Sequence, residues 1–129
     1  MKFFDASAIL NLVKRGDMRA FLDGITLDLA LYECMNAIWK EFLLLKNVDR
    51  ETALEFARIV SEVIAAIQVV SAGDFGREIL EFAAGNGITA YDAAYIVMAI
   101  KKGATFVTDD EKLRRIASNY LKAISSRDI

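Results

Sequence analysis

Short apolar runs alternate along the chain with longer stretches that have helical hydrophobic spacing. The apolar runs have the length of buried strands and occupy 2–5, 25–28, 68–70, 104–107 and 120–124. The helical stretches occupy 7–14, 29–46, 50–67, 75–84, 91–102 and 109–119. Gly16 and Gly103 are placed to end two of these helices, and residues 85–87 to break a third. This alternation predicts an α/β fold with a mainly parallel central sheet covered on both faces.

Acidic residues lie at the carboxyl ends of two of the predicted strands. Asp5 is the last residue of the run at 2–5, and Asp109 and Asp110 follow the run at 104–107. In a parallel sheet these positions meet at one edge, where ligands bind beyond the carboxyl ends of the strands. Helix capping also fits, because Asp5 can cap the first helix and Thr108 with Glu111 has the spacing of a capping box. The pattern therefore leaves two explanations open, a binding site and a set of helix caps.

Two further carboxylates lie within predicted helices. Glu33 shares a narrow polar stripe with Asn36 and Lys40, and the opposite side of that helix is apolar. Asp92 begins an otherwise apolar helix face, where a bare charge requires a partner. Thr89, three positions earlier, again allows a helix-capping explanation.

The composition indicates one domain without a membrane span. A length of 129 residues suits a single domain covering 1–129. Hydrophobic residues make up 55% of the chain, yet charges interrupt every stretch long enough to cross a bilayer. Asp5 lies where a signal peptide would be apolar, so we expect a cytoplasmic protein. Cys34 is the only cysteine, which agrees with a reducing compartment and predicts a buried thiol.

Charge and histidine content narrow the chemistry. The net charge of −2 gives no indication of a broad basic surface for non-specific nucleic-acid binding. The chain has no histidine, which excludes Ser-His and Cys-His nucleophiles and removes the commonest zinc ligand. If the protein is an enzyme, we expect carboxylates to carry its chemistry.

A cluster of carboxylates needs something to offset its charge. Two charges about 5 Å apart repel by roughly 3 kcal/mol at an effective dielectric near 20. Such a cluster opposes folding unless a cation bridges it or some of its members stay protonated. Mg²⁺ and Mn²⁺ prefer oxygen ligands, and Mg²⁺ also accepts substrate phosphate oxygens. This chemistry suits hydrolysis of a phosphodiester bond.

Four short blocks in the sequence resemble the PIN-domain ribonucleases, specifically the VapC-type toxins of prokaryotic toxin–antitoxin pairs. The blocks are FFDASAIL, LYECMNAIWK, ITAYDAAYIVMAIKKGA and FVTDDEKL, at 3–10, 31–40, 88–104 and 106–113. They occur in the order found in that family and span nearly the whole chain. The resemblance implies one three-layer α/β/α PIN-like domain with a mainly parallel central sheet. It also implies an endoribonuclease that depends on Mg²⁺ or Mn²⁺.

The resemblance also implies the residues of the site and its partners. The expected catalytic and metal-binding carboxylates are Asp5, Glu33, Asp92 and Asp110. Expected accessory residues are Ser7, Asn36, Thr108 and Asp109, with Asp109 either an accessory ligand or a helix-capping charge. Basic residues near the predicted edge could contact RNA phosphates: Lys14, Arg15, Lys112, Arg114 and Arg115. We further expect a homodimer and an antitoxin that covers the acidic site.

Three alternatives remain beside this hypothesis. A catalytically silent PIN-like module would bind RNA or protein without cleavage, as fold alone does not establish turnover. The segment GNGITA at 85–90 formally fits a dinucleotide-binding fingerprint, but a helix is predicted before it where a strand is required. A receiver-like domain phosphorylated on aspartate shares the acidic edge, but gives Glu33 no role.

Overall fold

A five-stranded parallel sheet forms the centre of the molecule in the computed structural model, which describes residues 1–129. The strands are β1 (Lys2–Phe4), β2 (Gly24–Leu27), β3 (Gln68–Val70), β4 (Thr105–Val107) and β5 (Ala123–Ile124). They pair in the order β3-β2-β1-β4-β5, and every pair is parallel. The predicted sheet is therefore confirmed. The carboxyl ends of all the strands meet at one edge.

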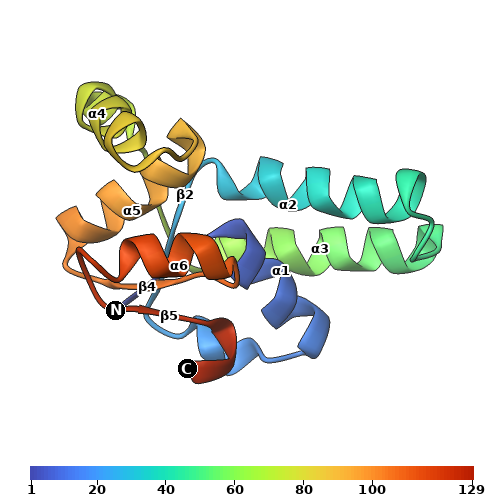
Figure 1. Ribbon diagram of the computed structural model, residues 1–129. Helices are drawn as coiled ribbons and strands as arrows, with labels where there is room; N and C mark the ends of the chain where they lie inside the picture. Colours follow the sequence, from blue (N-terminus) through green and yellow to red (C-terminus); the bar gives the residue numbers. More distant parts are fainter.

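The chain also forms six α-helices (Figure 1). They are α1 (Ala6–Arg15), α2 (Ala30–Trp39), α3 (Arg50–Ala66), α4 (Gly76–Asn86), α5 (Ala90–Lys102) and α6 (Glu111–Ala117). Of these, α5 contacts the central strands and α4 packs on α5. Short 3₁₀ segments occur at η1 (Met18–Phe21), η3 (Gly73–Phe75) and η4 (Ser126–Asp128), and a π-helical turn at η2 (Lys40–Leu44). In Figure 1, α2 and α3 lie side by side and project away from the sheet as a helical hairpin.

Two neighbouring phenylalanines on β1 show the three layers. Successive strand residues point to opposite faces of a sheet. Phe3 packs edge-to-face on Tyr95 of α5, with ring centroids 6.5 Å apart. Phe4 packs on Phe21 of η1 on the other face, at 5.2 Å. Both faces of β1 are thus buried, which confirms the predicted α/β/α arrangement and explains why two consecutive residues of that strand, Phe3 and Phe4, are apolar.

Local sequence signals set most helix ends. The side chains of Asp5, Asp110 and Thr89 accept hydrogen bonds from backbone N–H groups and cap α1, α6 and α5. Gly16 and Gly103 follow α1 and α5 with left-handed φ values of 71° and 62°, as predicted. The capping explanation of these polar residues is therefore correct, and whether they also bind a ligand is a separate question.

The predicted helix break at 85–87 is wrong in detail. Helix α4 continues through Gly85 to Asn86 and ends at Gly87, which alone has a left-handed φ of 64°. Glycine weakens a helix interior by about 1 kcal/mol without forbidding it, so Gly85 does not end the helix. The segment 85–90 therefore joins two helices, and the strand required before a dinucleotide-binding fingerprint is missing.

Three other predicted boundaries also shift. The helix predicted at 29–46 is α-helical only to Trp39, then continues as the η2 turn, and Lys46 has a left-handed φ of 55°. The helix predicted from 109 begins at Glu111 because Asp110 is its cap. The last strand covers 123–124 rather than 120–124, and η1 was not predicted at all.

Cys34 is buried with a free thiol, as expected. None of the helices has the length and apolar character needed to cross a membrane.

Candidate active site at the carboxyl edge of the sheet

Four loops or helix starts converge at the carboxyl edge of the sheet. Asp5 follows β1, and Asp110 follows β4 after two intervening residues. Glu33 lies in the first turn of α2, which begins soon after β2 ends. Asp92 lies in the first turn of α5, the helix that precedes β4 and covers the central strands. All four predicted carboxylates thus come from the same end of the sheet.

Asp5 is held on both of its carboxylate oxygens. Oδ1 accepts hydrogen bonds from Ser7 Oγ at 2.7 Å and from the backbone N–H of Ala8 at 3.0 Å. Oδ2 accepts a hydrogen bond from the Thr108 hydroxyl, which joins β1 to β4. Burial raises the pKa of Asp5 to about 6, although these hydrogen bonds oppose the rise. The residue is only 6% exposed and its side chain is held by three hydrogen bonds, so the carboxylate of Asp5 has a fixed orientation.

Glu33 is positioned by a residue that the sequence pattern counted as apolar. The hydroxyl of Tyr95 donates a hydrogen bond of 2.7 Å to Glu33 Oε1. Burial raises the pKa of Glu33, and the negative charge of Asp92 adds to that rise. Burial and Glu33 also raise the pKa of Tyr95, so the phenol keeps its proton and remains a donor. Tyr95 lies three residues after Asp92, and this i, i+3 spacing was the available signal for its position.

Asp92 and Asp110 line one small cavity of about 230 Å³. Burial raises the pKa of Asp92, and the charge of Asp110 raises it further. Asp110 is exposed, and its Oδ1 accepts a hydrogen bond of 2.9 Å from the backbone N–H of Leu113. Lys112 lines the same cavity and supplies a positive charge at its rim.

Asp109 does not cap the helix, because Asp110 does. Oδ1 of Asp109 accepts from the backbone N–H of Ser126 at 2.7 Å. Oδ2 accepts from Ser126 Oγ at 2.6 Å and from Asn11 Nδ2 at 2.8 Å. Burial opposes ionisation of Asp109, but the hydrogen bonds from Ser126 and Asn11 and the charge of Arg15 outweigh it and lower its pKa. Asp109 therefore ties η4 to α1.

The other predicted accessory residues divide into two groups. Ser7 Oγ donates to Asp5 and accepts from the backbone N–H of Asp109 at 3.1 Å. Thr108 donates to Asp5 and accepts from the backbone N–H of Asp110 at 3.1 Å, so it does not form the capping box predicted with Glu111. Asn36 is exposed on α2, outside this hydrogen-bond network.

None of the four carboxylates at the acidic edge forms an ion pair with a basic side chain. None of the ion pairs in the molecule includes Asp5, Glu33, Asp92 or Asp110. The charges of these carboxylates interact in neighbouring pairs, Glu33 with Asp92 and Asp92 with Asp110. The structure contains no group of three or more Asp, Glu or Cys side chains placed to hold one metal ion together. The predicted carboxylates therefore share an edge without forming a tight cage.

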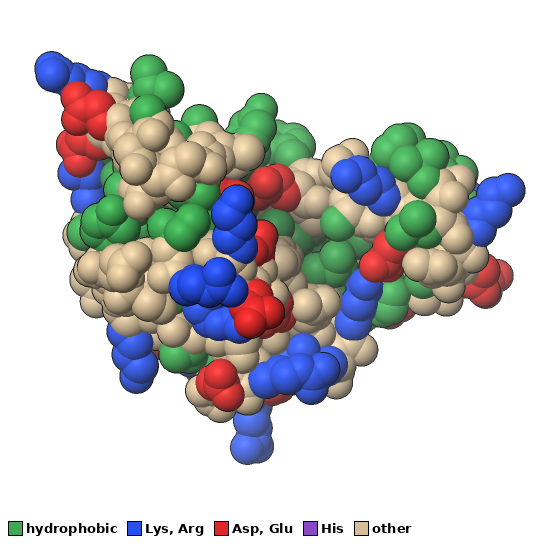
Figure 2. All heavy atoms as spheres, in the orientation of Figure 1, with side chains coloured by type: hydrophobic (Ala, Val, Ile, Leu, Met, Phe, Trp, Pro, Cys, Tyr) green, Lys and Arg blue, Asp and Glu red, His purple; other side chains and the backbone are tan.

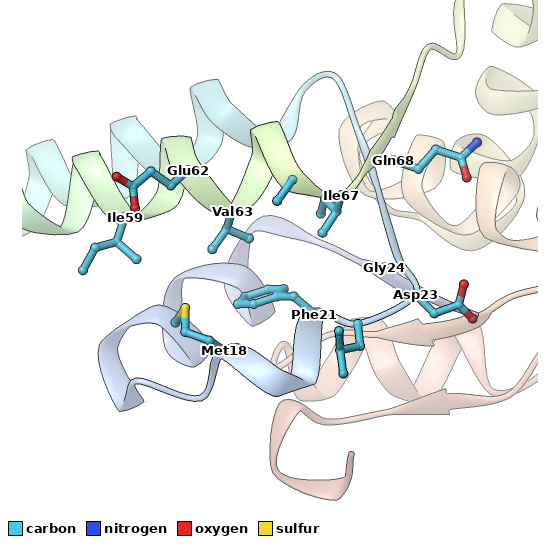
Figure 3. Close-up of a pocket in the computed structure, with 11 residues that line it drawn as sticks. Met18, Phe21, Asp23, Gly24, Ile59, Glu62, Val63, Ile67 and Gln68 are labelled. Atoms are coloured by element: carbon cyan, nitrogen blue, oxygen red, sulfur yellow. The ribbon is translucent and has the colours of Figure 1, made fainter.

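An apolar cavity of about 430 Å³ lies at the opposite edge of the sheet (Figure 3). Gly24 and Gln68, the first residues of β2 and β3, line it, so it is at the amino ends of the strands. Phe21, Val63 and Ile67 supply part of its apolar wall. This cavity is therefore not part of the acidic site.

A family model of the PIN domain matches residues 2–119. "Ribonuclease VapC3" of Pyrobaculum aerophilum is 36% identical over 90 residues, which cover 68% of this chain and 66% of that protein. "Exonuclease VapC9" of the same organism is 36% identical over 87 residues, or 67% of this chain and 62% of that protein. The matches thus span slightly less than two thirds of the length of these relatives.

Solved structures share the fold. PAE2754 from Pyrobaculum aerophilum superposes with a TM-score of 0.82 at 29% identity, covering 98% of this chain and 84% of that one. FitAcB from Neisseria gonorrhoeae superposes with a TM-score of 0.65 at 15% identity, covering 100% of both chains. The family model matches nearly the whole chain. The sheet of this chain carries acidic residues at its carboxyl edge. The chain belongs to the PIN domain family.

Proposed function

We propose that the chain is a divalent-metal-dependent endoribonuclease and the toxin of a toxin–antitoxin pair. The observation that carries this proposal is the set of carboxylates at one sheet edge without any basic ion-pair partner. Three of them, Asp5, Glu33 and Asp92, also have raised pKa values. The names of the two relatives, a ribonuclease and an exonuclease, support nuclease chemistry.

A hard divalent cation fits this edge. It would offset the charge of Asp5, Glu33, Asp92 and Asp110, which we propose as its ligands, some of them directly and the others through bound water. Mg²⁺ commonly uses one or two carboxylates, keeps several waters and takes the rest of its ligands from substrate phosphate. The pairwise arrangement of the carboxylates agrees with such a sparse protein contribution. When bound, such an ion stabilises the negative charge that develops on the phosphate during hydrolysis.

The neighbouring side chains position the proposed site. Ser7 and Thr108 fix the two oxygens of Asp5, and Tyr95 fixes Glu33. This preorganisation removes the cost of orienting the carboxylates during reaction. Lys112, at the rim of the cavity lined by Asp92 and Asp110, is placed to attract a substrate phosphate.

Purified protein, RNA and metal test the proposal directly. Mg²⁺ or Mn²⁺ should raise the melting temperature and support cleavage, because an ion that binds only the folded state stabilises it. Asp5→Asn and Asp92→Asn should lose both effects. Asp28→Asn is the matched control, because Asp28 is an exposed aspartate directly after β2 at the same edge. Equal loss in the control would show that the effect is not specific to the proposed site.

A separate substrate is needed to distinguish endonuclease from exonuclease activity, since one relative is named a ribonuclease and the other an exonuclease. A circular RNA has no ends, so only an endonuclease can open it. Conversion of the circle to a linear product supports the endoribonuclease proposal. Degradation of linear RNA with the circle left intact would instead indicate exonuclease activity.

A catalytically silent RNA- or protein-binding module is the second candidate. The observation that favours it is the lack of any group of three acidic or cysteine side chains gathered to hold one metal ion. RNA binding that persists without cleavage in both Mg²⁺ and Mn²⁺ would support this candidate over the enzyme.

The proposal also includes a homodimer and an antitoxin that covers the acidic edge. Support for a protein interface comes from apolar side chains exposed at the tip of the α2–α3 hairpin: Trp39, Leu43, Leu44 and Leu45. Sedimentation velocity tests the dimer, which would have twice the 14.3 kDa mass of the chain. A single monomeric species across micromolar concentrations would contradict it.

A further inference from the structure

A second cavity at the carboxyl edge is polar on all sides. It has a volume of about 460 Å³ and no hydrophobic side chain in its lining. Its walls are Asn11, Arg15, Asp109, Arg114, Ser125 and Arg127. The three arginines come from α1, α6 and η4, so the fold gathers them from distant parts of the chain. Figure 2 shows Lys and Arg side chains beside Asp and Glu side chains over the α6 region.

Positive charge dominates this cavity. Asp109 is the only acidic residue in the lining, and its two oxygens already accept three hydrogen bonds from Asn11 and Ser126. None of the three arginines takes part in an ion pair. Each guanidinium has five N–H donors, which leaves most of them free to bind an anion.

Two of the arginines are held in place by the protein. Arg15 Nη2 donates a hydrogen bond of 2.7 Å to Ser126 Oγ. Arg114 Nη1 donates a hydrogen bond of 2.9 Å to the carbonyl oxygen of Thr108. Arg127 is exposed, and its guanidinium group is free to approach a ligand. The cavity thus has two oriented guanidinium groups and one adaptable group.

The cavity adjoins the acidic site through a short series of contacts. Arg114 binds the carbonyl of Thr108, and the Thr108 hydroxyl binds Asp5. Ser7 connects the same regions, because it donates to Asp5 and accepts from the N–H of Asp109. These hydrogen bonds show that the cavity lies next to Asp5 at the acidic edge.

We infer that this cavity is a phosphate subsite that binds an internal phosphodiester group of the RNA strand, next to the group at the acidic edge. The inference rests on the proposed function for its substrate. Arginine forks match the geometry of phosphate oxygens and bind them with charge-assisted hydrogen bonds. Such a contact positions the strand and sets its direction without reading the bases.

Arg127→Gln is the informative variant, because Arg15 and Arg114 also bind protein atoms. The measurement is the affinity for a short single-stranded RNA, without metal, over a range of salt concentrations. Loss of one phosphate contact should weaken binding several-fold at low salt and reduce the slope of log K against log salt by about 0.7. Arg19→Gln, at an exposed arginine on η1, is the matched control and should behave as the unmodified protein.

The outcomes separate this inference from the proposed function. Because binding is measured without metal, an inactive protein still reports on the subsite. Cleavage by the unmodified protein, together with unchanged affinity and slope in Arg127→Gln, would overturn the subsite and leave the nuclease intact. A reduced slope in a protein that never cleaves would support the subsite and contradict the enzyme.

Two further measurements show whether the cavity binds an internal phosphodiester group, a terminal 5′-phosphate or free inorganic phosphate. The effect of Arg127→Gln should be the same for RNAs with and without a 5′-phosphate. An effect seen only with the 5′-phosphate would overturn the inference in favour of a terminal-phosphate pocket. Binding of inorganic phosphate with no change in RNA affinity between the two proteins would also overturn it.

Discussion

Asp110 caps a helix and, in our proposal, also binds the cation, so this one residue would serve both explanations that the sequence left open. Its Oδ1 caps α6 by accepting the backbone N–H of Leu113, and its charge acts on Asp92 in the cavity that they share. Capping needs only a side-chain oxygen, whereas attraction for a cation needs the negative charge. Asparagine and aspartate cap helices about equally well, so a substitution can remove the charge and keep the cap.

We expect Asp110→Asn to reduce RNA cleavage strongly with little loss of stability. The free energy of unfolding should change by less than about 0.5 kcal/mol, while cleavage should fall by about 100-fold, a typical effect of removing one electrostatic stabiliser. Asp110→Ala should lose the same activity and about 1 kcal/mol of stability with the cap. Urea unfolding and RNA cleavage assays measure the two effects. If Asp110→Asn cleaves normally, Asp110 serves only as a cap.

The positions of individual side chains could be predicted only where the contact is local. The cap from Asp5 to Ala8 joins residues three apart, and residue type with spacing was enough to predict it. The hydrogen bond from Tyr95 to Glu33 joins residues 62 apart, and that from Asn11 to Asp109 joins residues 98 apart. Such contacts depend on how helices pack against the sheet. No local pattern gave Tyr95 or Asn11 a polar role.

Helices and strands were predicted well where hydrophobic spacing decides the structure. The end of α4 was predicted poorly, because the sequence does not give the backbone angles of its glycines. Gly85 lies within α4 and has open space where a Cβ would lie, whereas Gly87 has the left-handed φ that ends the helix. Gly24 at the start of β2 is constrained by packing instead. A Cβ there would lie 2.8 Å from the carbonyl oxygen of Phe21 and 2.9 Å from the ring of Phe4.

The same substitution at these two glycines should therefore have opposite effects. Gly85→Ala should stabilise the protein by roughly 0.5–1 kcal/mol, because alanine is the better helix former and meets no neighbouring atom. Gly24→Ala should destabilise it by about 1–3 kcal/mol, because the new methyl group overpacks against backbone that cannot move freely. Midpoints of chemical unfolding compare the two variants. A loss of stability in Gly85→Ala would mean that α4 ends before Gly85, as the sequence had suggested.

Across the whole molecule, the parallel sheet concentrates charge where it costs stability. Parallel strands bring their carboxyl ends together, so the topology itself places Asp5, Glu33 and Asp92 at the same edge of the sheet. Burial raises the pKa of each, which means that the folded protein resists their ionisation more than the unfolded chain does. Offsetting this cost is the physical role that we propose for the cation.

This cost should appear as a pH dependence of stability in the metal-free protein. Below pH 3.8, the ordinary pKa, Asp5 is protonated in both states and contributes no difference. As pH rises to about 6, the unfolded chain releases the proton while the folded protein retains it, so stability falls. The rise in pKa from 3.8 to about 6 corresponds to a total loss of about 3 kcal/mol.

Asp5→Asn should remove the contribution of Asp5 to the pH dependence of stability. The comparison of the two proteins then shows whether ionisation of Asp5 stabilises or destabilises the fold. Asparagine can still cap α1, and the Thr108 hydroxyl can accept from the new amide, so the variant should fold. Unfolding in urea at several pH values should show the two metal-free proteins converging near pH 4. The variant should be more stable by about 3 kcal/mol above pH 6. Glu33 and Asp92 remain in both proteins, so their contributions largely cancel in the difference.

Addition of Mg²⁺ at pH 7 completes the experiment. The ion should stabilise the unmodified protein and leave Asp5→Asn nearly unchanged, which would narrow or reverse the difference between them. An unmodified protein that becomes more stable as pH rises from 4 to 6, relative to the variant, would contradict the raised pKa of Asp5. It would show that the hydrogen bonds from Ser7, Thr108 and Ala8 outweigh the cost of burying this carboxylate, so that no cation is needed to offset it.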